Sequence, residues 1–395
     1  MKIIDAKDGS EQTPQNKPQQ LPNAKPNYMN VKKNLIIANV SDATGCGHIR
    51  CILPFTYINS VFGKDMSLAP FVTPIFIKQP DILLRSRSIL FQRQMSPEHI
   101  NTLRQYKELQ KQFKFKLVYD FDDLLWGKNE FQGGDKFHGI PSYNFASDRV
   151  SVEMKEAALE IMSMCDVITT STHYLKDYVT PLVKGTKVEY LQNTVPVYLW
   201  SRKERPQETE DIKKPVVVFN ESPTHYSNEK KMFGDLDNAW RDWFIKSVHN
   251  NEIELHVMGG LPWFFEEIRS KVKIYEWLSA YQYPYVMKMI NPHFVISPLV
   301  PNEFNSSKSD IKKIEAQANG TIPIGTVFND RPSPYDNNMV KAPEDIDVQG
   351  IDELIKKYCD RDLVNATVMK GYRELEQTDR YTESKGFINR INQIF

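Results

Sequence analysis

The sequence predicts an α/β protein made of two tandem doubly wound, Rossmann-like domains that face each other across a cleft. Short apolar runs of strand type alternate with helical patterns along the chain, and this alternation is typical of a parallel sheet covered by helices. Near residue 200 a charged stretch with few apolar residues interrupts the alternation, which then starts again. In such sheets ligands bind at the carboxyl ends of the strands, so we expect the functional site in the cleft.

The length and composition agree with two globular domains. The chain has 395 residues, of which 41% are hydrophobic and 11% aromatic, and this is enough for two cores. No apolar run reaches the roughly 18 to 20 residues that a membrane-spanning helix needs, and the N-terminus has no apolar signal core. We therefore expect a cytoplasmic protein. Cys46, Cys51, Cys165 and Cys359 form no CxxC pair, which favours free thiols over disulfides or structural zinc.

Composition also predicts the domain boundaries. Residues 1–32 are rich in Pro, Gln, Asn and Lys, and we expect them to be a disordered leader. An N-terminal domain at 33–200, a linker at 201–215 and a C-terminal domain at 216–375 are expected to follow. Residues 376–395 should end in a helix that packs back onto the body, because its apolar side chains share one stripe. These side chains belong to Phe387, Ile388, Ile391, Ile394 and Phe395.

The individual elements follow from the same patterns. In the first domain, strands are predicted at "NLIIANV", "ILLRS", "SILFQRQ", "FKLVYDFD" and "DVITTS", and helices at residues 97–112 and 152–164. In the second domain, strands are predicted at "VVVFNES", "EIELHVMGG", "KVKIYEW", "HFVISPL" and "TIPIGT". Each domain therefore has enough strands for an open sheet.

The segment "EFNSSKSDIKKIEAQANGTIPIG" combines a helix with clustered charge. Ser307 followed by Asp310 is a helix start signal, and the later Asn-Gly pair is a stop signal. A helix of about three turns is therefore expected between them. The apolar residues that would face a core at helical spacing are Ile311, Ile314 and Ala318.

Another face of the same helix would carry Lys308, Lys312 and Glu315. This face can be a solvated surface with a weak Lys312 to Glu315 pair. Alternatively it can form a nucleotide-sugar site, in which the helix N-terminus and the lysines receive phosphate oxygens and the carboxylate binds ribose hydroxyls. The helix by itself leaves both interpretations open.

Three segments together resemble a known family. They are "VYDFDDLLW", "ESPTHYSN" and "HFVISPLVPNEFNSSKSDIKKIEAQANGTIPIGT", and they are similar to segments of glycosyltransferases with the GT-B architecture, of the "glycosyl transferases group 1" type, including phage-borne members. The resemblance covers roughly residues 35–335. It implies a sugar transferred from a nucleotide-sugar donor, such as a UDP-sugar, to an acceptor hydroxyl. It implies no other cofactor and no metal.

The resemblance also implies roles for residues of the charged helix segment. Lys308, Ser309 and Lys312 would lie near the donor phosphates, and Glu315 would bind the ribose. The family often has an earlier glutamate that contacts the sugar, and Glu303 is the nearest candidate, although "FNSSKSD" departs from the commoner "GFG" form.

Two turns are further candidates for donor contacts. Ser222, Thr224 and His225 follow a predicted strand, where backbone N–H groups and a hydroxyl can meet a diphosphate, although His225 can also be a plain turn residue. Gly45 and Gly47 in "SDATGCGHIR" lack the third glycine of the dinucleotide fingerprint, so they do not indicate NAD. They would still let the backbone approach a ligand closely.

The candidates for catalysis are an acidic strand end and two histidines. Asp120, Asp122 and Asp123 end an apolar strand, and strand geometry would place Asp120 and Asp122 on one face. They can bind Mg²⁺ or cap a turn, but we favour activation of the acceptor hydroxyl as a general base. His138 in a glycine-flanked loop is an alternative base, and His48 can contact donor or acceptor or be structural.

The charge distribution bears on the acceptor. Net charge is zero, but basic residues dominate residues 78–116, a stretch that can be a solvated helix face or a polyanion-binding patch. With the likeness to phage proteins, it suggests DNA with hydroxymethylated bases as acceptor, bound through Arg85, Arg87 and Arg93 in the host cytoplasm. The alternatives are a bacterial surface glycan or a protein as acceptor, a nucleotide-sugar 2-epimerase, and a degenerate enzyme that serves as a binding module.

Overall fold

The computed structural model describes residues 32–42, 45–62, 67–71, 79–124, 152–200, 206–221, 225–226, 228, 231, 234–236, 238–338 and 340–395. The chain divides into two units, Met1–Lys32 and Lys33–Phe395. All described helices and strands lie in the second unit. The boundaries expected inside this unit, at 200 and 215, stay predictions.

Two parallel sheets of six strands each form the framework of the described residues. The first has the order β2-β1-β3-β4-β5-β6 and the second the order β12-β11-β10-β7-β8-β9. The strands of the first sheet are β1 (Leu35–Asn39), β2 (Ser67–Phe71), β3 (Ser86–Gln92), β4 (Lys116–Phe121), β5 (Val167–Thr170) and β6 (Lys187–Tyr190). Those of the second are β7 (Val216–Phe219), β8 (Glu254–Met258), β9 (Lys273–Tyr275), β10 (Phe294–Ser297), β11 (Ile322–Val327) and β12 (Val340–Pro343).

The strand order confirms the predicted fold class. In the first sheet the order reverses between β1 and β3, and in the second between β7 and β10. Ligands of doubly wound sheets bind outside the carboxyl ends of the strands at such reversal points. The central strands are buried on both faces, with Ile36, Leu117 and Val217 fully covered, and this explains their continuous apolar runs.

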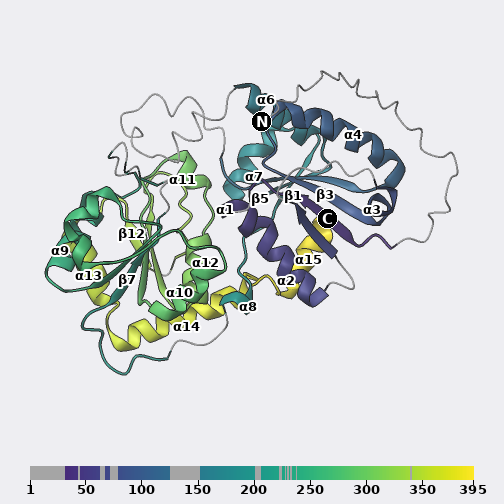
Figure 1. The fold of residues 1–395 in the computed structure, drawn as a ribbon. Coiled ribbons are helices and arrows are strands. Elements are labelled where there is room, and N and C mark those ends of the chain that lie inside the picture. Colours follow the sequence, from purple (N-terminus) through teal and green to yellow (C-terminus); the bar gives the residue numbers. More distant parts are fainter. Residues whose placement is uncertain are drawn as a thin grey trace, which may run out of the picture. The chain divides into compact units, whose positions relative to one another are not determined.

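Helices connect the strands (Figure 1). The helices of the first sheet are α1 (Gly45–Gly47), η1 (His48–Ile52), α2 (Leu53–Phe62), α3 (Pro80–Arg85), α4 (Pro97–Phe113), α6 (Val152–Met164), α7 (His173–Val179) and η3 (Thr180–Leu182). Helix α8 (Val197–Trp200) follows β6, and its Trp200 packs in a cluster with residues of the second sheet. With the second go α9 (Asn238–His249), η4 (Trp263–Lys271), α10 (Gln282–Ile290), α11 (Glu303–Ser307), α12 (Ile311–Ala318), α13 (Val348–Lys357) and α14 (Arg361–Gln377). The last helix is α15 (Lys385–Ile394).

One predicted strand is wrong, and three strands are missing from the prediction. The segment "ILLRS" belongs mainly to helix α3, where Pro80 occupies the first turn and Asp81 follows it. Both residues favour a helix start, and a short apolar run alone does not distinguish helix from strand. The missing strands β2, β6 and β12 all lie at sheet edges.

The C-terminal helix α15 packs on the core of the first sheet, as its apolar stripe predicts. Ser384 caps its first turn by accepting a hydrogen bond from the Phe387 N–H. Phe387, Ile388, Ile391, Ile394 and Phe395 join one buried cluster with residues of β1, α2, β3 and β4. Figure 1 shows α15, in yellow, beside α2. The end of the chain therefore completes the domain with which the described residues begin.

Candidate functional site

A cavity of about 620 Å³ lies at the carboxyl ends of strands from both sheets. Asp122 and Asp123, which follow β4, line it from the first sheet. Asn220 and Glu221, which follow β7, line it from the second. Gly45 and Cys46, which follow β1, also line it, so the reversal points of both sheets meet at one cavity, where the fold predicts a ligand.

The charged helix segment lines this cavity. Lys308, Ser309, Lys312 and Glu315 all belong to its wall; Lys312 and Glu315 lie on helix α12 (Ile311–Ala318), whereas Lys308 and Ser309 precede it. The segment is two helices, α11 and α12, and α12 has 8 residues, fewer than the expected three turns. Asp310 precedes α12 without capping it, because its carboxylate pairs with Arg380.

The face of α12 that carries Ile314 and Ala318 is buried, at 1% and 2% exposure. Ile311 packs against the same cluster and also lines the cavity. The helix is therefore held by its core face, and its charged face is left to the cavity.

Two of these charged groups have unusual surroundings. Burial raises the pKa of Glu315 to about 8, although Lys312 acts against the shift. The Nζ atom of Lys312 lies 2.5 Å from an oxygen of Glu221, forming an ion pair. Glu221 was not among the residues that the sequence singled out. An acidic residue directly after the apolar run "VVVFN" is the same signal that drew attention to Asp120, Asp122 and Asp123.

His225 is fixed in the wall of the cavity by a buried carboxylate. Its Nδ1 atom lies 2.7 Å from Asp235 Oδ2, and its Nε2 atom lies 3.5 Å from Lys308 Nζ. Burial lowers the pKa of His225 well below its usual value, so the ring is neutral at pH 7. Gly234 lets its segment pass close to the backbone of His225, since a Cβ atom at position 234 would lie 1.5 Å from the His225 carbonyl oxygen. Ser222 and Thr224 lie outside the described residues.

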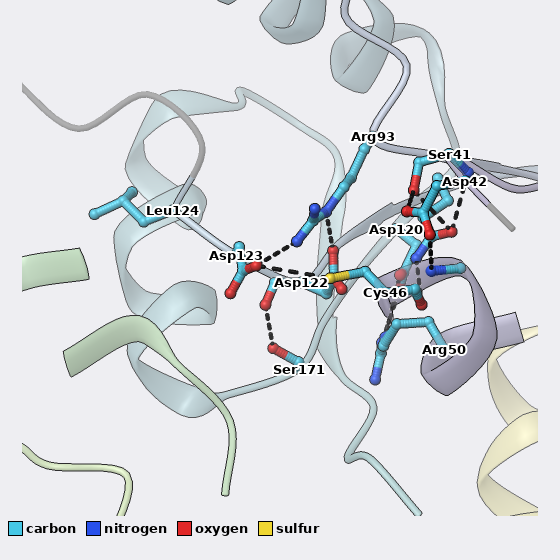
Figure 2. A network of polar contacts seen from close by, with 12 residues as sticks. Ser41, Asp42, Cys46, Arg50, Arg93, Asp120, Asp122, Asp123, Leu124 and Ser171 are labelled. Atoms are coloured by element: carbon cyan, nitrogen blue, oxygen red, sulfur yellow. Dashed lines mark hydrogen bonds and ion pairs between the residues drawn. The ribbon is translucent and has the colours of Figure 1, made fainter. Parts of the chain in front are cut away.

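The acidic cluster of the first sheet is held by two arginines (Figure 2). Asp120 is 1% exposed and accepts hydrogen bonds from Arg50 at 2.6 Å and 3.1 Å and from Thr169 at 2.6 Å. It is not among the residues lining the cavity. Of the two carboxylates expected to share one face, only Asp122 lines the cavity, and it follows β4, which ends at Phe121.

Arg93 clamps the other two carboxylates. Its guanidinium pairs with both Asp122 and Asp123 (Figure 2), and its backbone has a φ of 51°, which is rare outside glycine. Burial raises the pKa of Asp122 to about 6, against the opposing effect of Arg93. Arg93, expected to contact DNA, thus binds the acidic pair that lines the cavity.

The glycine turn contributes to the cavity through Gly45 and His48. The His48 ring meets Tyr281 edge to face, with centroids 5.9 Å apart. Gly47 is not among the lining residues, and a Cβ there would lie 1.9 Å from the Asp42 carbonyl oxygen. This glycine therefore permits close packing of the turn.

The remaining predicted residues that the structure describes are not among those lining the cavity. Glu303 in α11 is not among the lining residues. Arg85 is exposed at the end of α3, and Arg87 donates to Asn392 of α15. His138 lies outside the described residues.

Asn193 joins the two halves of the site, although no sequence signal singles it out. Its amide oxygen accepts from Arg50 at 2.9 Å, and its amide nitrogen donates to Ser309 Oγ at 2.7 Å. Arg50 in turn holds Asp120. A buried hydrogen-bond chain therefore runs from β4 to the segment that carries Lys308 and Lys312.

Comparison with known proteins shows the fold. No protein family model matches the chain, and no curated protein sequence matches it. HepE (Alr3699) from Anabaena in complex with UDP has a TM-score of 0.55 at 9% identity, over 91% of this chain and 98% of that one. The same protein with UDP-glucose has a TM-score of 0.53 at 10% identity, over 91% and 99%.

WaaG, a glycosyltransferase involved in lipopolysaccharide biosynthesis, has a TM-score of 0.53 at 10% identity, over 88% of this chain and 96% of that one. These likenesses and the two parallel sheets define the fold class as GT-B. Within the described residues, no helix has the length and apolar character required to cross a bilayer.

Proposed function

We propose that the chain is a glycosyltransferase that moves a sugar from a UDP-sugar to an acceptor hydroxyl. One observation carries this proposal: a single cavity places Lys308, Lys312 and Glu315 together with Asp122 and Asp123. The first three suit a nucleotide diphosphate, and the last two suit an acceptor hydroxyl. The UDP and UDP-glucose complexes of HepE, which has the same fold, support a donor of this class.

In the donor half of the cavity, two lysines and the start of a helix offset the negative charge of the diphosphate. Lys308 and Lys312, with the N-terminus of α12, stabilise the charge that grows as the bond from the anomeric carbon to the diphosphate oxygen breaks. Glu315, with its pKa near 8, is mainly protonated at pH 7. It can therefore both donate and accept hydrogen bonds with the ribose hydroxyls.

In the acceptor half, Asp122 is the proposed base. A carboxylate with a pKa of about 6 is ionised at pH 7 and still basic enough to take a proton. It would receive the proton of the acceptor hydroxyl as that oxygen bonds to the anomeric carbon. Because the lysines carry the leaving charge, the proposal needs no metal and no other cofactor, and activity should survive EDTA.

The acceptor remains a separate prediction. The sequence suggests modified phage DNA, with a surface glycan or a protein as alternatives. Of the three arginines expected to contact DNA, Arg85 is exposed at the end of a helix, whereas Arg87 and Arg93 have partners within the chain. DNA binding should fall steeply with salt if phosphates are the contact, and fluorescence anisotropy at low and high salt measures this.

The experiment for the function is a donor and acceptor screen. The protein is incubated with a panel of nucleotide sugars, alone and with hydroxymethylated DNA or glycans, with and without EDTA. Free UDP together with a mass increase of the acceptor supports the transferase. An epimerised sugar without transfer would favour the 2-epimerase, and loss of activity in EDTA that Mg²⁺ restores would make the carboxylates metal ligands.

A further inference from the structure

Glu221 is a buried carboxylate with unused hydrogen-bonding capacity in the cavity wall. It is 2% exposed, lines the cavity, and neither of its carboxylate oxygens has a hydrogen-bond partner within the described residues. Buried polar groups almost always have partners. A ligand in the cavity is therefore the natural partner for these oxygens.

The position of Glu221 is fixed from the preceding residue. The amide of Asn220 donates to the Tyr283 hydroxyl at 2.7 Å and accepts from Ser297 at 3.3 Å. Both partners come from other elements, α10 and β10. The end of β7, which carries Glu221, is thus supported from two other elements.

Two nitrogen groups lie close to Glu221 without saturating it. Lys312 Nζ is 2.5 Å from its Oε2 atom, yet this nitrogen also makes no hydrogen bond within the described residues. His225 Nδ1 is 3.3 Å from the same oxygen, but Asp235 lies closer to it, at 2.7 Å. Lys312 balances the charge of Glu221, and both groups keep hydrogen-bonding capacity for a ligand.

We propose that Glu221 binds the transferred sugar of the donor, accepting hydrogen bonds from its hydroxyl groups, while Lys312 lies between this carboxylate and the diphosphate. This inference rests on the proposed function. A second anion is an unsuitable partner for a buried carboxylate, because like charges repel strongly where water is excluded. Hydroxyl groups are suitable, because a carboxylate has two oxygens that accept several hydrogen bonds.

The inference also accounts for Glu303. That residue is the sugar-binding candidate of the sequence, but it is not among the residues lining the cavity. Of the carboxylates that line it, Asp122 and Asp123 are bound by Arg93, and Glu315 is proposed for the ribose. Glu221 is the lining carboxylate left to contact the sugar.

A matched pair of variants tests the inference. Glu221→Gln removes the carboxylate beside Lys312, and the control Glu374→Gln removes the carboxylate beside Lys313. Both ion pairs measure 2.5 Å, but neither Lys313 nor Glu374 is among the residues lining the cavity. Calorimetry then compares UDP with UDP-glucose, UDP-galactose and UDP-N-acetylglucosamine, and uses the UDP-sugar that the wild type binds best.

Glu221→Gln is expected to change the affinity for the UDP-sugar and the affinity for UDP differently. Glu221→Gln should weaken UDP-sugar binding by about tenfold to a hundredfold, the scale of hydrogen bonds to a charged group. It should leave UDP binding unchanged or tighter, because Lys312 loses its competing anion. Glu374→Gln should change neither.

Equal changes in the affinities for UDP and for the UDP-sugar would overturn the inference and make Glu221 only the counter-ion of Lys312. If Glu221→Gln fails to fold, Glu221→Asp, which keeps the charge but withdraws it by one methylene, should show the same difference. A wild type that binds neither UDP nor any UDP-sugar would overturn the proposed function, and with it this inference.

Discussion

The two sheets present acidic side chains at their carboxyl ends in different states. In the first sheet, Asp120 and Asp122 are each bound by an arginine, Arg50 and Arg93. In the second, Glu221 faces a lysine, Lys312, and its oxygens make no hydrogen bond within the described residues. The carboxylates at the first sheet already have partners within the chain, whereas Glu221 at the second sheet has hydrogen-bonding capacity left for a ligand.

The chemistry of the two cations explains the difference. A guanidinium is planar and can bind a carboxylate through two parallel N–H groups, whereas an ammonium is a compact charge on a flexible stem. The arginine pairs therefore fix the geometry of the first end before any ligand arrives. The ammonium group of Lys312 can contact a phosphate beside Glu221 with little rearrangement.

The largest expected effect comes from removing an arginine. Arg50→Ala would leave Asp120, at 1% exposure, without its counter-ion, and breaking a buried pair in this way costs about 3 to 5 kcal/mol. Urea unfolding should show this loss in the free energy of unfolding. The control is Lys111→Ala, whose pair with Glu108 is 70% exposed on both sides and is worth at most about 1 kcal/mol. Similar losses in both variants would contradict the comparison.

The next effect concerns the rate. Asp122→Asn should lower turnover by about a hundredfold or more, the scale of a lost general base, while UDP-sugar binding is retained. Steady-state kinetics combined with donor titration measure the two quantities separately. Asp120→Asn should mainly reduce stability, because Asp120 is bound to Arg50 and does not line the cavity. A full rate in Asp122→Asn would remove Asp122 as the base.

A smaller effect is expected on donor affinity. Glu315→Ala should weaken UDP binding by about 1 to 3 kcal/mol, because the ribose hydroxyls are left without their partner, with the fold intact. Titration calorimetry measures the affinity, and the exposed Glu353→Ala on α13 serves as the control. Unchanged affinity in Glu315→Ala would rule out the ribose contact.

The smallest effect is a displacement of the pH profile. The active form of Asp122 is the carboxylate, so the wild-type rate should fall as pH drops below about 6, near its pKa. Arg93 lowers this pKa, so Arg93→Gln should raise it and move the acid limb to higher pH. Rates measured between pH 5 and pH 8 check the direction. A shift of the acid limb to lower pH would mean that a group other than Asp122 controls the fall in rate.

Local patterns predicted most of the fold and the charged face of α12. Apolar runs and helical spacing are properties of neighbouring residues, and the central strands and α4 follow them. The edge strands β6 and β12 were not predicted, because they are short and have exposed positions. Their apolar pattern is therefore weak.

The partners of the site residues could not be predicted in this way. Arg50 and Asp120, or Arg93 and Asp122, are joined only by the packing of strands and turns that lie far apart in the sequence. The sequence showed Arg93 as one of several basic residues, and only the fold brings it to the acidic pair. Glu221 had a local signal, an acid after an apolar strand, but its contact with Lys312 also depends on tertiary packing.

The position of α15 has a consequence for synthesis of the chain. The strands β1, β3 and β4 leave the ribosome before the helix that covers their buried cluster, which is formed by Lys385–Ile394. Domains usually fold from the N-terminus as they emerge. Here the first domain must wait, with part of its apolar surface uncovered, until the second has been made. A nascent chain halted before residue 385 should therefore bind chaperones and resist proteases poorly, even with its whole first sheet translated.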